Sequence, residues 1–449
     1  MRQPSRTLVR VLAGVAGLAA LAVGISGCSS SGGATGSGSP TTVTFRIWSD
    51  DAVAAAYEKS FDAFTKANPE ITVKVDQVPW ANYWDKLRTD LSSGSGDDIF
   101  WTNAYNFAPY ADNAKLVNVS SKLKSEVDAW EPSAVKQYTR KGSLWGVPQL
   151  IDGGKVLYYN KELVKKAGVD LTDLAWNPTD SGKDTFLPAL KKLTVDSAGR
   201  TANEAGFDGS NLAQYGFNAS NDFDAIIGNF VGSNGGLYQA DGKYTFASNA
   251  KAEQAIEYVV NLVDKYHVAP SAADTNGNAD FARDQFLQGK LAVFESGSYN
   301  LSTIQKSAKF GWGIAPIPAG PAGRIPVTNS IIATGNANST HADATLKVLR
   351  WIGSEKGSLA LGASGSLIPA VTAAQGPYFD YWQKQGVDAK PIVDGVADGT
   401  LKNDIIPNAA ATSADLTTAL NEIFAGRSNG SIAAALKAAQ TAANAGLTE

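Results

Sequence analysis

The stretch LWGVPQLIDGGKVLYYNKELVKKAG, residues 144–168, predicts a strand, an extended crossing, a second strand and a helix. Two short apolar runs lie on either side of the DGG sequence at 152–154, and such runs favour strands. The glycines and Pro148 predict an extended connection between them. Because a few backbone dihedrals of such a connection can absorb a rotation, we expect a hinge at Pro148–Gly154.

Before this stretch, strand patterns alternate with helix patterns. Strands are predicted at 41–48, 71–80 and 97–103, and amphipathic helices at 51–69 and 80–96. Strands that alternate with helices predict a parallel, doubly wound sheet. Further helices are expected around residues 184–194, 250–266, 279–289, 342–356 and 412–445.

The composition argues against several classes of function. The body from about residue 41 has roughly 400 residues, more than the number at which a single hydrophobic core stops growing, so two domains are expected. A formal net charge of -4 and the lack of a basic run argue against nucleic acid as a partner. His267 and His341 are the only histidines, so neither a metal site nor a cofactor is predicted, and no enzymatic activity is expected.

The first 40 residues predict export and a lipid anchor. Three arginines in the first ten residues precede an apolar run that is shorter than the ~20 residues of a membrane-spanning helix. ISGC at 25–28 then resembles a bacterial lipobox, in which the cysteine is acylated. We expect a signal peptide at 1–27, lipidation of Cys28 and a flexible tether at 28–40. The alternative is that Cys28, the only cysteine, is a buried structural residue.

Six motifs along the chain resemble the extracellular solute-binding family that includes the maltose-binding proteins. They are the opening stretch, GDDIFWTNAYNFAPYADNAKL, FLQGKLAVFESGSYN, FGWGIAPIPAGPAG, HADATLKVLRWIGSEKG and AALKAAQT. The resemblance implies an α/β, two-lobed periplasmic-binding-protein-like fold of type II. Each lobe is then a sheet flanked by helices, and the ligand cleft lies between the lobes. Lobe 1 is expected to comprise 41–150 and 328–376, and lobe 2 to comprise 151–327 and 377–449.

The same resemblance implies a function. The protein is expected to be a monomeric lipoprotein on the extracellular face of the cell membrane. It would capture a mono- or oligosaccharide by lobe closure and deliver the sugar to the permease subunits of an ABC importer. Further hinges are expected near Arg324–Thr328 and Gly376–Tyr378. Two alternatives are a secreted carbohydrate-active hydrolase that uses Asp152 and Glu295, and a sugar-sensing lipoprotein without a transporter.

Candidate ligand contacts follow from the chemistry of sugars. Their hydroxyls bind carboxylates and amides, and their apolar faces stack on aromatic rings. Because open α/β sheets bind ligands at the carboxyl ends of strands, residues that follow predicted strands are candidates. From this rule we select Ser49, Asp50, Asp51, Trp101, Asn103 and Tyr105. A helix N-cap is the alternative role for the first three.

The resemblance supports some of these residues and adds others. It implies a stacking ring at Trp101 and a hydroxyl ligand at Asn103, and an acidic sugar ligand at Asp152. It also implies an aromatic contact at Tyr299. The further candidates near these positions are Glu295, Ser296 and Asn329.

Other aromatic residues are predicted to lie in the core. Trp80, Trp84, Leu87 and Leu91 have the spacing of one helical face. The sequence departs from the maltose binders at 412–413, where Thr and Ser replace stacking aromatics. The site is therefore not expected to be identical to a maltodextrin site.

Overall fold

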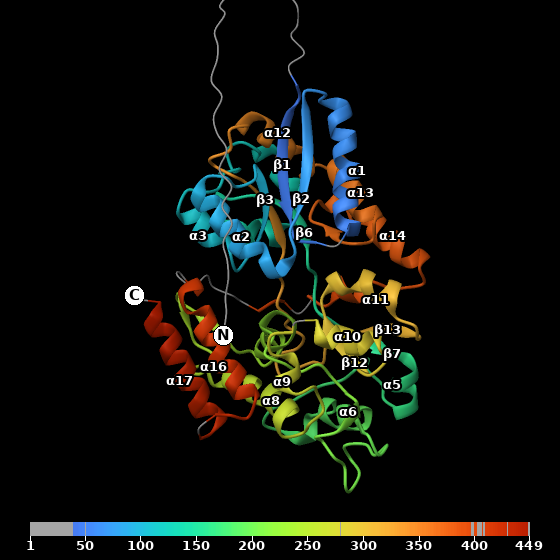
Figure 1. Cartoon of the computed structure of the whole chain (residues 1–449). Helices are drawn as coiled ribbons and strands as arrows, with labels where there is room; N and C mark the ends of the chain where they lie inside the picture. The colour runs from blue at the N-terminus through green and yellow to red at the C-terminus, as the bar shows by residue number, and fades with distance from the viewer. Residues whose placement is uncertain are drawn as a thin grey trace, which may run out of the picture. The chain divides into compact units, whose positions relative to one another are not determined.

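The computed structural model describes residues 39–49, 51–278, 280–396, 399–401, 406, 409–428 and 430–447 (Figure 1). The predicted lipidation site Cys28, the predicted signal peptide and the candidate Asp50 lie outside these residues. Residues Pro40–Glu449 form one compact unit. No helix in the described ranges combines the length and the apolar composition that crossing a bilayer requires.

The first lobe is built on a six-stranded sheet with the order β15-β6-β14-β3-β1-β2. Its strands are β1 (Thr41–Ile47), β2 (Ile71–Gln77), β3 (Ile99–Asn103), β6 (Val147–Ile151), β14 (Ile331–Gly335) and β15 (Ile368–Pro369). β1 pairs in parallel with β2 and β3, whereas β14, β6 and β15 pair antiparallel with their neighbours. The parallel pairing predicted for the three strands before residue 144 is therefore confirmed, whereas β6, β14 and β15 form an antiparallel half for which the alternation made no prediction. β14 follows the strands of the second lobe, so the chain re-enters the first sheet from the opposite end.

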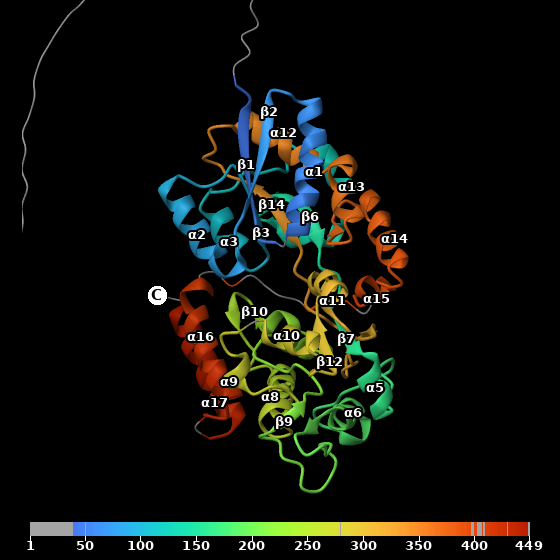
Figure 2. The same ribbon diagram turned by 45° about the vertical axis from the view of Figure 1, so that its right-hand side comes forward.

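Helices pack on both sides of this sheet. They are α1 (Asp51–Ala67), α2 (Trp80–Ser93), α3 (Phe107–Asp112), α4 (Pro132–Tyr138), α12 (Ala342–Ile352), α13 (Glu355–Ala363) and α14 (Gly376–Lys384). α1 packs against α13 and β2, and α2 and α3 lie on the other side of the strands (Figures 1 and 2). The core between the layers includes Phe45, Tyr57 and Leu87, which are fully buried. Each such side chain stabilises the fold by ~1.5–3 kcal/mol.

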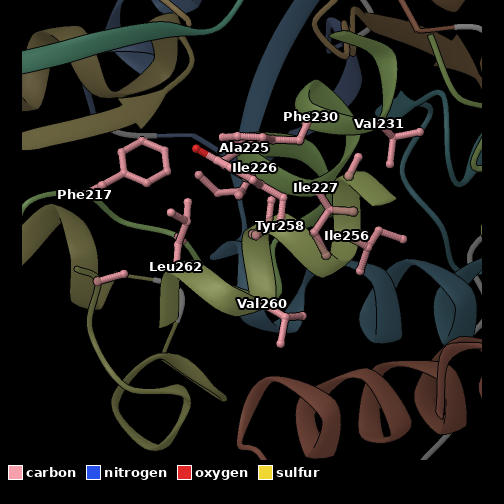
Figure 3. Packing of buried hydrophobic residues seen from close by; sticks show 14 of the residues in the cluster. Phe217, Ala225, Ile226, Ile227, Phe230, Val231, Ile256, Tyr258, Val260 and Leu262 are labelled. Atoms are coloured by element: carbon pink, nitrogen blue, oxygen red, sulfur yellow. The ribbon is translucent and has the colours of Figure 1, made fainter. Parts of the chain in front are cut away.

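The second lobe contains a three-stranded antiparallel sheet in the order β12-β7-β13. Its strands are β7 (Val156–Asn160), β12 (Val293–Ser296) and β13 (Trp312–Pro316). Its helices are α5 (Lys161–Ala167), α6 (Phe186–Leu193), the π-helix η3 (Phe223–Ile227), α7 (Gly228–Ser233), α8 (Ala250–Asp264), α9 (Ala272–Thr275), α10 (Phe281–Leu287), α11 (Leu301–Ser307), α15 (Lys390–Asp394), α16 (Ala409–Phe424) and α17 (Ile432–Gly446). Phe217, Ile226, Phe230 and Tyr258 pack in its core, where the rings of Phe230 and Tyr258 stack 5.9 Å apart (Figure 3).

Six short strands form three separate two-stranded pairs. They are β4 (Thr139–Arg140) with β5 (Ser143–Leu144), β8 (Val195–Asp196) with β9 (Leu212–Gln214), and β10 (Gln239–Ala240) with β11 (Lys243–Tyr244). All three pairs are antiparallel.

The opening stretch forms the predicted elements, namely β6, a crossing, β7 and α5. The side chain of Asn160 caps α5 by accepting hydrogen bonds from the backbone N–H groups of Glu162 and Leu163. Gly168 ends the helix in the left-handed conformation, where a Cβ atom would be unfavourable. The cap and the terminating glycine therefore explain why the helix begins and ends where it does.

A third apolar cluster lies at the crossings between the two sheets. It includes Ile151 and Val156 on either side of the first crossing, together with Trp382 and Ile392. The N–H of Gly154 donates to the carbonyl of Ile392, with 2.6 Å between the atoms. The prediction of an extended crossing at Gly376–Tyr378 is wrong, because α14 begins at Gly376 and packs against α13.

Candidate ligand cleft

A cleft of about 1780 Å³ is lined by residues from both sheets and their helices. In the first lobe, its walls include Trp84 of α2 and Tyr105 in the loop between β3 and α3. In the second lobe, they include Phe223 of the π-helix and Thr417 of α16. Gly153 lines the cleft at the first crossing. The cleft is therefore bounded by the carboxyl-end loops of the first sheet, by the second lobe and by a crossing.

A buried ionic cluster lies at this crossing. The ammonium of Lys155 is fully buried and pairs with the carboxylates of Asp152 and Asp224, 3.1 Å from Oδ2 of Asp224. The same ammonium donates to the carbonyl of Val327 in the second crossing, 3.4 Å away. Its nitrogen lies 5.9 Å from the ring centroid of Tyr299. The ammonium of Lys155 thus contacts the first crossing, the second crossing and the π-helix, and it lies near the ring of Tyr299.

The cluster shifts the pKa values of its members. Burial opposes the charge of Lys155, but the two carboxylates outweigh burial and hold the pKa of Lys155 above its usual value. Burial raises the pKa of Asp152 to about 6, and the neighbouring ammonium of Lys155 acts in the opposite direction. The ammonium of Lys155 therefore keeps its charge where it faces the carboxyl groups of Asp152 and Asp224 beside the cleft.

Tyr105 reaches from the first lobe to the second. Its hydroxyl donates to Oδ1 of Asp224 across 3.1 Å, and its ring lies 6.1 Å from that of Phe223. The neighbouring Asn103 is buried, and its side-chain oxygen accepts hydrogen bonds from the N–H and side-chain amide of Asn106. Asn329 accepts a hydrogen bond from the N–H of Ala104 through its side-chain oxygen, 3.3 Å away.

Of the candidates in and directly after β12, only Tyr299 is exposed. Tyr299 is 48 % exposed, whereas Glu295 and Ser296 are buried. The side-chain amide of Asn229 donates to Oε1 of Glu295 across 2.9 Å, while Oε2 is buried and has no hydrogen-bond partner among the described residues. Burial raises the pKa of Glu295 to about 8. Glu295 therefore lies inside the second lobe and does not face Asp152 across the cleft.

The candidates in the first lobe are dispersed. Trp101 is 1 % exposed, and its ring packs 5.3 Å from Trp48, so in this conformation it offers no face to a ligand. Ser49 and Asp51 lie near the end of β1, where the side-chain amide of Gln77 donates to the carbonyl of Ser49 and to Oδ1 of Asp51. The structure thus places Asp152, Tyr299 and Tyr105 around the ionic cluster, and Trp101, Glu295 and Ser296 in the interior.

Sequence reasoning missed three residues, two of which belong to the ionic cluster and one to the wall of the cleft. Lys155 and Asp224 complete the ionic cluster, and Trp84 lines the cleft. The core prediction for Trp80 is wrong, because its side chain is 53 % exposed. Both tryptophans follow β2, so the rule that selects residues after strands would have found them. Leu87 is fully buried, as predicted from the same helical face.

The chain matches the model of the bacterial extracellular solute-binding protein family over residues 49–359. The fold and the cleft agree with this class, and the chain belongs to the family. It is accordingly a solute-binding protein of two α/β lobes and not an enzyme.

The chain is similar to several named proteins. The maltodextrin-binding protein MdxE of Bacillus subtilis is 25% identical over 79% of each chain. A maltooligosaccharide ABC transporter solute-binding lipoprotein of Streptococcus pneumoniae is 26% identical over 69% of this chain and 68% of the relative. The crystal structure of UspC from M. tuberculosis is 46% identical, with a TM-score of 0.74 over 90% of this chain and 100% of UspC. Lmo0181 of Listeria monocytogenes in complex with cycloalternan has a TM-score of 0.75 at 22% identity, over 90% of this chain and 98% of Lmo0181, and so shares the fold.

Proposed function

We propose that this solute-binding protein captures a sugar in the cleft and delivers it to the permease subunits of an ABC importer. The observation that carries the proposal is the cleft between the lobes, which is lined by Tyr105 and by Gly153 at the crossing. The carboxylates of the ionic cluster lie beside these two residues, since Asp224 accepts a hydrogen bond from Tyr105 and Asp152 precedes Gly153. Sugars need polar partners for their hydroxyls and flat apolar partners for their ring faces. The names of the maltodextrin- and maltooligosaccharide-binding relatives support this ligand class.

Binding in this proposal uses residues on both sides of the cleft. Asp152 and Asp224 accept hydrogen bonds from sugar hydroxyls, and the ammonium of Lys155 pairs with both carboxylates. Tyr299 and Tyr105 supply the stacking faces, since both rings are partly exposed. Ser49, Asp51 and Asn329 remain candidates at the edge of the first sheet. Because a ligand that touches both lobes binds the closed form better, sugar binding shifts the population towards closure.

Two parts of the proposal, lipidation and membrane anchoring, concern the N-terminal region. The lipobox-like ISGC sequence supports lipidation of Cys28 and anchoring on the extracellular face of the membrane. A Cys28→Ala variant should fold and bind sugar but should not incorporate labelled fatty acid or stay with the membrane fraction. Unchanged labelling and membrane retention in this variant would contradict the anchor and leave sugar binding intact.

The binding function is tested with a thermal-shift screen over mono- and oligosaccharides, followed by calorimetry. A cognate sugar at 100 times its Kd should stabilise the protein by ~2.7 kcal/mol. Asp152→Asn should weaken the binding, because a sugar hydroxyl would lose a charged acceptor. Deletion of the gene for this protein separates import from sensing: loss of sugar uptake supports an importer. Unchanged uptake together with tight binding would favour the sensing alternative.

A further inference from the structure

Trp80 and Trp84 form an aromatic row on α2, in which Trp84 lines the cleft and Trp80 packs against Trp84. Trp84 and Arg88 of this helix line the cleft. Trp80 lies one turn before Trp84, and the two rings are 5.5 Å apart at an angle of 88°. Trp80 is the most exposed of the large hydrophobic side chains in the described part of the chain. An indole in this position leaves a wide apolar face available beside the cleft.

The row is held in place by the core of the first lobe. The ring of Trp48 lies 5.5 Å from that of Trp80 and 5.1 Å from that of Trp84. Trp48 in turn contacts the buried rings of Trp101 and Tyr83 at 5.3 Å and 4.7 Å. Because these contacts restrict the rotamers of the row, a ligand that stacks on it loses little side-chain entropy of the protein.

The other wall of this part of the cleft supplies hydroxyls among apolar side chains. Ser413 and Thr417 of α16 line the same cleft together with Leu416 and Leu420, and α16 belongs to the second lobe. α2 and α16 lie on the same side of the protein in both ribbon views (Figures 1 and 2). A sugar ring has one apolar face and a rim of hydroxyls, which suits a slot with indoles on one wall and both hydroxyls and apolar side chains on the other. At 412–413 of α16, Thr and Ser replace the stacking aromatics of the maltose binders. The indoles of α2 supply apolar surface from the opposite lobe instead.

The size of the cleft indicates a ligand longer than one sugar unit. Its volume of about 1780 Å³ exceeds the ~300–1,000 Å³ that is typical of pockets for small ligands. The cleft extends from Gly153, next to the ionic cluster, to Trp84 on α2. A single sugar at the cluster would leave the aromatic row uncovered.

We propose that Trp80 and Trp84 form a second subsite that stacks the later units of an oligosaccharide whose first unit binds at the Asp152–Lys155–Asp224 cluster. The inference rests on the proposed function, because it specifies the length of the sugar that binds in the same cleft. Affinity then increases with chain length, and the increase comes from the indoles of α2. Arg88 at the same wall supplies hydrogen bonds to the hydroxyls of the stacked units.

The test is isothermal titration calorimetry of the full chain with two series of sugars. One series is glucose, maltose, maltotriose and maltotetraose, and the other is mannose, mannobiose and mannotriose. The variants are Trp80→Ala, Trp84→Ala and the conservative Trp84→Phe. Trp351→Ala is the matched control, because Trp351 is a partly exposed indole on α12 whose ring contacts Phe64 outside the cleft lining.

In the wild type, affinity should increase from the monosaccharide to the trisaccharide of the preferred series. Trp80→Ala and Trp84→Ala should each lower the trisaccharide affinity about tenfold, which is ~1.4 kcal/mol, and leave the monosaccharide affinity unchanged. Trp84→Phe should restore most of the loss, and Trp351→Ala should bind like the wild type. If Trp84→Ala does not fold, Trp80→Ala still tests the inference, because the side chain of Trp80 is exposed. Quenching of the Trp80 fluorescence by the trisaccharide gives an independent readout.

Two results would overturn the inference and leave the proposed function intact. One is a wild type that binds mono- and trisaccharides equally well, and the other is an increase with chain length that persists in Trp80→Ala. A wild type that binds no sugar of either series or of the wider screen would overturn the proposed function and the second subsite together.

Discussion

The hydroxyl of Tyr105 donates a hydrogen bond to Oδ1 of Asp224, and this contact joins the loop after β3 to the π-helix of the second lobe. The acceptor also pairs with Lys155 through its other oxygen, so the contact connects the first lobe to the ionic cluster at the crossing. A change in the distance between the lobes must break or form this hydrogen bond. Tyr105 and Asp224 therefore couple lobe position to the charges that we assign to the ligand site.

The first prediction concerns this contact. Tyr105→Phe keeps the ring beside Phe223 but removes the hydroxyl that donates to Asp224. Because Tyr105 is 41 % exposed, we expect a loss of about 1 kcal/mol in sugar binding, at the low end for a hydrogen bond to a charged group. Small-angle scattering should also show a larger radius of gyration for the variant without sugar. Equal affinity and equal radius in the two proteins would show that the contact does not hold the lobes.

The second prediction concerns the buried cation. Lys155→Met leaves the carboxylates of Asp152 and Asp224 facing each other without a counter-ion, which should lower the free energy of unfolding by ~3–5 kcal/mol. The double variant Asp152→Asn with Lys155→Met should regain part of this loss, because one of the two carboxylates is neutralised. Urea titration of the wild type, both single variants and the double variant gives the coupling energy. Additive losses would argue against a coupled cluster.

The third prediction concerns the close approach of β12 to the crossing. A Cβ on Gly297 would come 2.3 Å from Cε1 of Tyr299 and 2.9 Å from Oδ1 of Asp152. Gly297→Ala should therefore displace the Tyr299 ring and weaken sugar binding. Gly376→Ala is the control, since a Cβ there meets no atom within 4 Å. Wild-type affinity in Gly297→Ala would indicate that Tyr299 does not contact the ligand.

More of the fold than of the site could be predicted from the sequence. The stretch at 144–168 carries its own signals, since apolar runs, Asp-Gly-Gly and the Asn160 cap are local features. The antiparallel half of the first sheet could not be predicted in this way, because β14 pairs with β3 across more than 200 residues. Lobe boundaries and the roles of the candidate ligand contacts stay predictions.

Trp80 and Asp224 show why the site was harder to predict. Helical spacing places Trp80 on the face of Leu87, but Trp80 is the first residue of α2 and its side chain is exposed, whereas Leu87 is buried. Asp224 lies in a π-helix whose sequence has no recognisable motif, and only the tertiary fold brings it to Lys155. Periodicity gives the face of a helix, whereas exposure along that face depends on where the neighbouring elements end.

The fourth prediction concerns pH. Burial raises the pKa of Glu295 to about 8, so between its unfolded pKa of ~4.3 and pH 8 the folded state holds a proton that the unfolded state releases. The free energy of unfolding should therefore fall as pH increases through this window, by up to ~1.4 kcal/mol per pH unit from this group. Glu295→Gln keeps the acceptor for Asn229 and cannot ionise, so it should remove this slope and be more stable than the wild type at pH 8. Parallel slopes in the two proteins would mean that Glu295 is ionised in the folded state.

The most direct test of the central claim is a distance between the lobes measured with and without sugar. Cys28 is the only cysteine, so a Cys28→Ser background accepts two spin labels without other reactive thiols. Labels at Lys66 on α1 and Lys437 on α17 report on the first and second lobe, respectively, and both positions are exposed. The account predicts that a saturating sugar, identified in the thermal-shift screen, shortens the distance in the wild type and that Asp152→Asn needs a higher sugar concentration for the same change. Binding heat from that sugar with an unchanged distance distribution would contradict capture by lobe closure.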